Sequence, residues 1–148
     1  MTNKPIHIAD KNGSLTLSID RQILTAEFSG ACSVKIAKGF HAGIQILGPL
    51  FNQQPWGYLS YSKDYQAATP EVEKMYMSTY KLCAFYGCKS EAYVMPSAVG
   101  LQQIGKIRRL CGVHSDISSF KFDTLEAARQ FLNNALYSYD QEYRLASE

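Results

Sequence analysis

The last third of the chain alternates apolar strand-like runs with amphipathic helical runs, and this alternation constrains the fold more than any other feature. It closes on Phe120–Leu132, where a short apolar run, polar residues that can begin a helix, and a helical stripe follow one another. Strands separated by helices pair in parallel, because only a long crossover returns the chain to the same end of a sheet. The pattern therefore predicts an α/β fold with a largely parallel sheet.

Antiparallel strands are expected at the start of this sheet. Leu15, Leu17 and Ile19 alternate with polar residues, and a second apolar run, residues 23–28, follows after a short polar connection. An alternating pair joined in this way is typical of a hairpin. Residues 6–8 can add one further short strand before it.

The remaining elements follow from apolar spacing and from the turn residues around it. Further strands are expected at residues 56–61, 92–95 and 119–122. Helices are expected around residues 36–47, 70–86, 97–111 and 124–143. The prediction is a mixed, mostly parallel sheet of about five strands with a leading antiparallel hairpin and about four helices. We expect one domain over residues 1–148, in which 137–148 form a C-terminal helical extension or tail.

Two helix starts carry capping chemistry. Thr69 precedes a proline and two glutamates, so we expect its hydroxyl to cap the helix that follows. A phosphate on Thr69 would lie at the same helix terminus but would face both glutamates, so capping is favoured over a phosphorylation switch. Asp123 and Glu126 are predicted to form a capping box at the start of the last helix.

Charge and hydropathy argue against two kinds of partner. The formal net charge is +2, and basic residues are spread along the chain apart from the short cluster at residues 106–109, so nucleic-acid binding is not expected. No apolar run approaches the ~20 residues of a membrane span, so none is expected. The first residues lack the apolar segment of a signal peptide. We expect a cytoplasmic protein.

The cysteines are predicted to be reduced and mostly buried. All four lie among apolar neighbours within or beside the expected helices: Cys32, Cys83, Cys88 and Cys111. Cys83 and Cys88 are five positions apart with no histidine beside them, which does not match the spacing of a zinc site. We therefore expect neither a metal nor a cofactor.

No catalytic arrangement stands out. Residues 114–116 read His-Ser-Asp, but neighbours in a loop point apart and cannot build a proton relay. His41 lies on the polar side of its predicted helix, so we expect it to be exposed to solvent. Gly39 and Gly43 fall within the same helical pattern, so we expect them to allow close packing rather than to bind phosphate. These observations favour a protein that is not an enzyme.

The order of elements and the closing segment Phe122–Leu132 resemble the SpoIIAA-like branch of the STAS superfamily, also described as STAS/SEC14-like. The resemblance extends from about Ile6 to Leu136. It implies a bacterial protein, a sheet with helices on one side, and regulation by protein contact without catalysis. Phosphorylated members carry an Asp-Ser-Ser-Gly type motif between the central strand and the next helix. The chain departs from the family here, because residues 62–71 contain no Ser-Gly pair.

The first functional hypothesis is a non-catalytic regulatory or interaction module that binds a protein partner or itself. The carboxyl ends of the parallel strands would form its contact surface. Hydroxyls and exposed amides are expected to make the contacts, at Ser29, Gly30, Ser62, Asp64, Thr69, Pro96 and Ser97.

The second hypothesis is a carrier or sensor of a small apolar or lipid-like ligand. The resemblance and the ten tyrosines motivate it, although tyrosines can also simply cover the edge of a core. The pocket would lie between sheet and helices and be lined by Phe40, Tyr58, Tyr61, Tyr76 and Met95. A carrier should have an apolar cavity, whereas an interaction module should have a filled core and an exposed patch.

The tyrosines of the predicted tail suggest a further contact. Tyr139 and Tyr143 continue the apolar stripe of the last helix at four-residue spacing. The stripe is longer than is needed to cover a sheet. We therefore expect these two residues to be candidates for self-association.

Overall fold

The computed structural model describes the backbone of residues 4–147 and the side chains of residues 4–142. The strands are β1 (Ile6–Ala9), β2 (Gly13–Asp20), β3 (Ile23–Gly30), β4 (Trp56–Ser62) and β5 (Cys88–Val94). The helices are α1 (Val34–Leu47), α2 (Pro70–Phe85), α3 (Ala98–Leu110) and α4 (Leu125–Ser147). Two short 3-10 segments, η1 (Gly48–Phe51) and η2 (Ile117–Phe120), lie between them.

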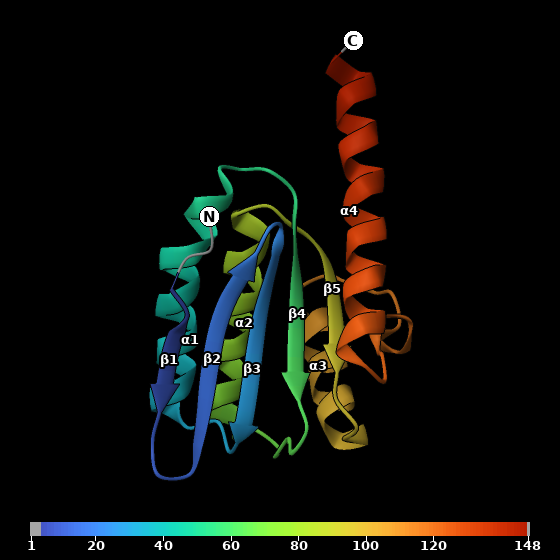
Figure 1. Cartoon of the computed structure of the whole chain (residues 1–148). Helices are drawn as coiled ribbons and strands as arrows, with labels where there is room; N and C mark the ends of the chain where they lie inside the picture. Colours follow the sequence, from blue (N-terminus) through green and yellow to red (C-terminus); the bar gives the residue numbers. More distant parts are fainter. Residues whose placement is uncertain (1–3, 148) are drawn as a thin grey trace.

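All five strands belong to one sheet in the order β1-β2-β3-β4-β5 (Figure 1). β1, β2 and β3 pair antiparallel, whereas β3, β4 and β5 pair in parallel. The parallel pairs are those joined through helices, as the alternation in the sequence requires. The predicted α/β fold with a leading hairpin and a mixed sheet is confirmed.

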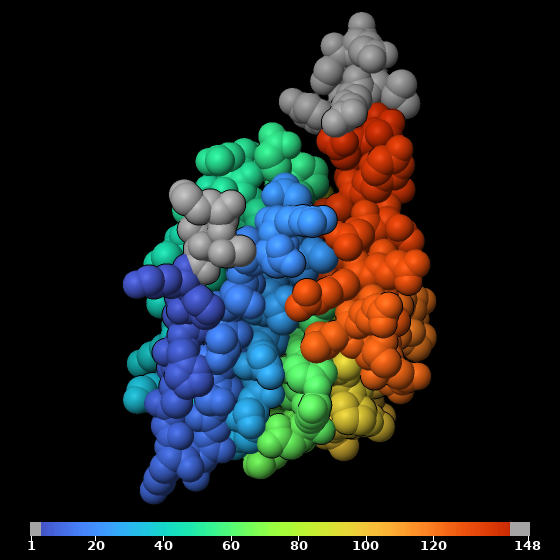
Figure 2. All heavy atoms as spheres, in the orientation of Figure 1, coloured from blue at the N-terminus to red at the C-terminus, as the bar shows by residue number. Residues whose placement is uncertain are grey.

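Helices cover both faces of the sheet, but unequally. α1 and α2 lie on one face, where Leu17, Ile44 and Trp56 belong to the larger buried cluster. α4 packs on the other face against β4 and β5, and Leu132 is buried there with Leu59. The resemblance implied helices on one side only, and the position of α4 differs from that. Figure 2 shows that α4 leaves β1 and β2 uncovered on this face, and it reaches β3 at Ile23.

α1 approaches the sheet closely because two of its turns carry glycine. A Cβ on Gly43 would fall well inside van der Waals contact with the side chain of Leu17, and a Cβ on Gly39 would crowd Ile8. Leu17 is fully buried, so its side chain has no room to move away. The expectation that these glycines serve packing agrees with this geometry.

Side-chain hydroxyl groups cap the N-termini of α2 and α3. Thr69 Oγ1 accepts a hydrogen bond from Val72 N at 3.3 Å, and Ser97 Oγ accepts one from Gly100 N at 3.0 Å. Both contacts satisfy amides that have no partner within the first helical turn. The predicted cap at Thr69 is confirmed.

The segment before α4 differs from the prediction in two respects. Residues 119–122 do not form a strand, because Asp116 Oδ1 accepts from Ser118 N and turns the chain into η2. Only a single parallel bridge, between Tyr93 and Lys121, connects this segment to β5. The cap of α4 is Thr124, whose Oγ1 accepts from Ala127 N at 3.1 Å, so the capping box at Asp123 is wrong.

None of the helices in the described part of the chain combines the length and the apolar composition that a bilayer crossing requires.

Replacing Gly43 by alanine should destabilise the protein by about 1–3 kcal/mol, because the added methyl group overpacks the contact between α1 and β2. Gly105→Ala is the matched control. Its Cβ would meet Arg109 Nη1 at 3.4 Å, an ordinary contact. Alanine there should be neutral or stabilising by up to about 1 kcal/mol, from helix propensity. Urea unfolding measures both, and equal effects of the two variants would contradict the packing argument.

Thr69→Ala should lower the free energy of unfolding by about 1 kcal/mol, because Val72 N loses its acceptor. Ser78→Ala provides a control on the same helix, since its exposed hydroxyl only contacts Lys74 O at 3.4 Å. Thermal or urea unfolding of the two variants is the measurement. A loss at Thr69 too small to detect would mean that it does not act as a cap, and a phosphorylation switch would again need consideration.

Candidate functional site

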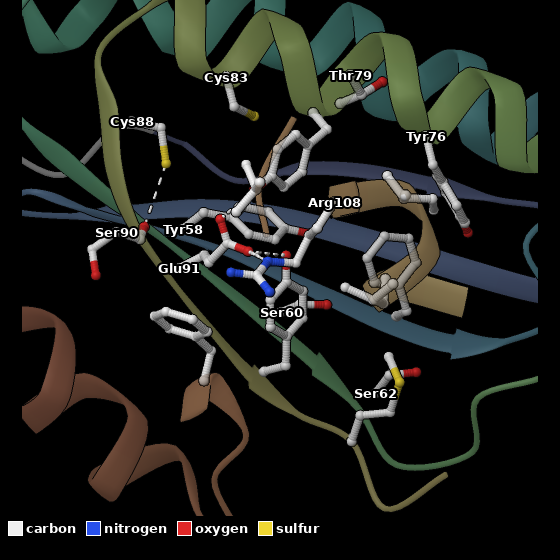
Figure 3. Close-up of a pocket in the computed structure, with 18 of the residues that line it drawn as sticks. Tyr58, Ser60, Ser62, Tyr76, Thr79, Cys83, Cys88, Ser90, Glu91 and Arg108 are labelled. Carbon is white, nitrogen blue, oxygen red and sulfur yellow. Dashed lines mark hydrogen bonds and ion pairs between the residues drawn. The ribbon is translucent and has the colours of Figure 1, made fainter. Parts of the chain in front are cut away.

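A cavity of about 520 Å³ lies between the sheet and helices α2 and α3. Strands β3, β4 and β5 form its floor and α2 its roof (Figure 3). α3 packs mainly against α2 and η2 rather than onto a strand, which leaves space between α3 and the sheet. Protein interiors are otherwise close-packed, and small-molecule sites have volumes of about 300–1,000 Å³. We therefore take this cavity as the candidate site.

The floor of the cavity follows from strand geometry. Successive side chains of a strand point to opposite faces, so Tyr58, Ser60 and Ser62 of β4 face α2. Leu59 and Tyr61 face α4 instead. Parallel pairing places Glu91 beside Tyr58 and Tyr93 beside Ser60, and both β5 residues also line the cavity.

Aromatic rings form much of the wall at the α1 side. Phe40 packs against three of them, with centroid distances of 5.5 Å to Phe28, 6.1 Å to Tyr58 and 6.3 Å to Tyr76. Two of these pairs are edge-to-face, the arrangement that the ring quadrupole favours. The rings support one another, so this part of the wall is rigid and apolar.

A buried ion pair forms the polar centre of the site. Arg108 Nε donates to Glu91 Oε1 at 2.5 Å, and the arginine side chain is only 2% exposed. The Tyr80 hydroxyl donates to Glu91 Oε2 at 2.7 Å, and the Tyr93 hydroxyl is 3.4 Å from Oε1. The carboxylate is thus held by donors from β5, α2 and α3.

The outer side of Arg108 fixes the segment that follows α3. Its Nη1 donates to Ser115 O at 2.6 Å and its Nη2 to Ser115 Oγ at 2.9 Å. The guanidinium carbon also lies 4.6 Å from the centre of the Phe120 ring, a cation–π contact. One side chain therefore connects the floor of the cavity to residues 113–120 beside it.

Burial keeps the thiols and phenols of the site protonated. It raises the pKa of Cys83 to about 12 and that of Cys88 well above its ordinary value, and the negative charge of Glu91 adds to both shifts. The pKa values of Tyr58 and Tyr93 are likewise raised, above all by burial. Since the thiolate is the nucleophile, these cysteines are inert near neutral pH.

His41 does not point into solvent as predicted. It is half-buried, and its Nδ1 lies 3.1 Å from Thr79 Oγ1 of α2. The Thr79 hydroxyl also donates to Met75 O at 3.1 Å. The histidine therefore bridges α1 and α2. The prediction failed because α2 covers the flank of α1 that the sequence pattern marks as polar.

The expected apolar pocket coincides largely with the cavity. Phe40, Tyr58, Tyr76 and Met95 line it. Tyr61 does not, since it lies on the α4 face of β4 and carries Lys63 Nζ at 5.5 Å from its ring centre.

The residues expected to contact a protein partner are only partly brought together. Gly30 and Ser62 line the cavity, and Gly30 N donates to Asp64 Oδ1 at 3.0 Å. Thr69 and Ser97 are the N-caps of α2 and α3, in the loops that follow β4 and β5. The remaining two are exposed: Ser29 and Pro96.

The sequence reasoning missed the polar centre. Arg108 was placed in the short basic cluster at residues 106–109, although it is four positions after Ile104 and directly follows Ile107 in the apolar stripe of α3. Glu91 lies within β5, and its side chain is on the same face of the strand as that of Tyr93. A charged residue within each apolar pattern was the available signal, and pairing the two would have located the site.

The tail residues give a mixed result. Tyr139 is 39% exposed and lines the outer part of the cavity, and α4 continues past the end of the sheet (Figure 1). The side chain of Tyr143 lies outside the described residues. Self-association through this pair stays a prediction. No group of three histidine, cysteine or acidic side chains is placed to hold a metal ion within the described residues.

Comparisons of this chain with protein-family models, with curated proteins and with solved structures give no match. The resemblance to the STAS superfamily therefore stays a prediction. The assignment of function depends on the geometry of the cavity.

Arg108→Met should destabilise the protein by about 3–5 kcal/mol, because it leaves the Glu91 carboxylate half-buried without its cation. Arg109→Met, at the exposed neighbouring position, should change stability by less than about 0.5 kcal/mol. Adding Glu91→Gln to Arg108→Met should recover part of the loss, because no buried charge then remains. Denaturant unfolding of the three variants is the measurement, and a mild effect of Arg108→Met alone would contradict this account.

Proposed function

We propose that the protein is a carrier or sensor that binds a small, largely apolar molecule between its sheet and helices α2 and α3. The cavity of about 520 Å³ carries this proposal, because it is large enough for such a molecule and has aromatic walls. Binding sites of this kind typically combine apolar walls with a few well-placed polar groups. The cluster of Glu91, Arg108, Tyr80 and Tyr93 supplies those groups.

The polar cluster is held in place by hydrogen bonds within the chain. Arg108 already donates to Glu91 and Ser115, and Glu91 accepts from three side chains. A site whose side chains are fixed in advance loses less conformational freedom on binding, which favours affinity. This supports a binding role in which selectivity comes from shape and from a small number of hydrogen bonds.

The protonation states in the cavity also support binding rather than covalent chemistry. The raised pKa values of Cys83 and Cys88 leave almost no thiolate at neutral pH. The four cysteines are free thiols, which fits a reducing compartment such as the bacterial cytoplasm. A reducing compartment of this kind is part of the proposal, and the free thiols support it.

A regulatory module that binds a protein partner or itself is the alternative. It would rely on hydroxyls and amides at the carboxyl ends of the strands. Several of these groups already have partners within the chain: Gly30 N bonds Asp64, and the hydroxyls of Thr69 and Ser97 act as helix caps. This observation favours the ligand-binding role over the interaction module.

Cys83→Leu should reduce ligand occupancy, because the larger side chain extends from α2 into the cavity. Native mass spectrometry of the protein purified from cells should show a discrete additional mass that disappears on denaturation. We expect Cys83→Leu to weaken ligand binding about tenfold in Kd, the equivalent of about 1.4 kcal/mol, and so to lower the bound fraction.

The matched control is Cys111→Leu, the same substitution at a half-buried cysteine that does not line the cavity. It should retain the bound mass. A wild-type protein without any bound mass, or equal occupancy in both variants, would contradict the proposed function.

A further inference from the structure

The charges that the cavity wall contains compensate one another. Arg108 and Glu91 are the buried or half-buried charged side chains among the described lining residues, and they form an ion pair. The remaining charged lining residue, Lys89, is exposed at the rim. A ligand with a net charge would bring an ion without a counter-ion against mostly apolar walls, which is costly.

The two side chains of this ion pair differ in how much of their hydrogen-bonding capacity is directed toward the cavity. The guanidinium donates outward to Ser115 and lies over the Phe120 ring, so much of its hydrogen-bonding capacity is used away from the aromatic walls. The Glu91 carboxylate lies on the floor of the site (Figure 3). Burial raises the pKa of Tyr58 and of Cys83, and the charge of Glu91 adds to both shifts, so the carboxylate lies near these wall residues.

Glu91 retains capacity to accept a further hydrogen bond. A carboxylate has about four lone-pair directions, and Arg108, Tyr80 and Tyr93 provide three donors. The Tyr93 contact is long at 3.4 Å, so a better-placed donor could replace it at little cost. An incoming N–H or O–H group is therefore the complement of this end of the cavity.

The shape of the walls indicates the rest of the ligand. Rigid rings from the sheet and from α1 and α2 meet the space, among them Phe28, Phe40, Tyr58 and Tyr76. Flat rings pack against such walls by offset or edge-to-face contacts with little loss of conformational freedom. An aromatic ligand gains these contacts in addition to burial of its apolar area.

We infer that the ligand is an uncharged aromatic ring compound with a hydrogen-bond donor that reaches Glu91. This inference rests on the proposed function, since it specifies the class of molecule held in the same cavity. Phenols and indoles represent the class.

Four probes that share one ring system test the inference on the full-length protein: 2-naphthol, naphthalene, 2-naphthoate and 2-naphthylmethylamine. At pH 7 the first two are neutral, the third is an anion and the fourth a cation. Isothermal titration should give 2-naphthol an affinity about tenfold or more above both ions, because of their uncompensated charge. The affinity for 2-naphthol should also exceed that for naphthalene by about threefold or more, because only 2-naphthol can donate a hydrogen bond to Glu91.

The Glu91→Gln variant tests whether the Glu91 carboxylate is responsible for the weak binding of the anionic probe. It keeps the shape but removes the negative charge, so 2-naphthoate should gain at least about tenfold relative to 2-naphthol as Arg108 loses its counter-ion. Glu27→Gln, at an exposed position of β3, is the control and should leave the order of the probes unchanged. If Glu91→Gln fails to fold, the order of affinity of the four probes for the wild-type protein still tests the inferred class of ligand.

The outcomes separate the two proposals. If either ion, or naphthalene, binds as tightly as 2-naphthol, the inferred class of ligand is wrong. The proposal that the cavity binds a ligand is then still supported. Failure of all four probes with a protein that carries a bound mass from cells also overturns the class. Failure of all four together with no bound mass overturns the proposed function itself.

Discussion

The ion pair between Arg108 and Glu91 is the interaction on which the candidate site depends. A guanidinium that is 2% exposed is stable only when its charge and its donors are matched. Glu91 and Ser115 match them from two directions, so Arg108 connects β5, α3 and residues 113–120. α3 itself packs mainly against α2 and η2, so Arg108 is a polar link from α3 to the sheet. The cavity lies around this link, and both members of the ion pair line it.

The general fold could be predicted from the sequence because its signals are local. Alternating periods identified the strands and helices, and Thr69 marked a helix start through chemistry within one turn. The errors arose where a distant or competing contact decides. Thr124 acts as the cap in place of Asp123, and a turn at Asp116 replaces the expected strand at residues 119–122. His41 bonds Thr79 because α2 lies beside α1.

The candidate site was predictable only in part, for a related reason. Phe40, Tyr58, Tyr76 and Met95 could be assigned to a pocket because aromatic and apolar residues between sheet and helices are expected to meet. The prediction for Tyr61 was wrong. In a strand that is apolar on both faces, the sequence does not show which alternate side chains face which helix. The polar centre is formed by Arg108 and Glu91, which are seventeen positions apart, and no local period reports such a contact.

The segment that Arg108 holds in place also affects how the sheet ends. Phe122 N donates to Tyr93 O at 2.8 Å, and Lys121 bridges to Tyr93, so the outer side of β5 is partly occupied by the chain itself. Exposed strand edges can recruit strands from other molecules and begin aggregation. β1, at the opposite end of the order, is only four residues long, and short edge strands offer few groups for such pairing. The contact that shapes the cavity thus also protects the sheet against growth from the β5 side.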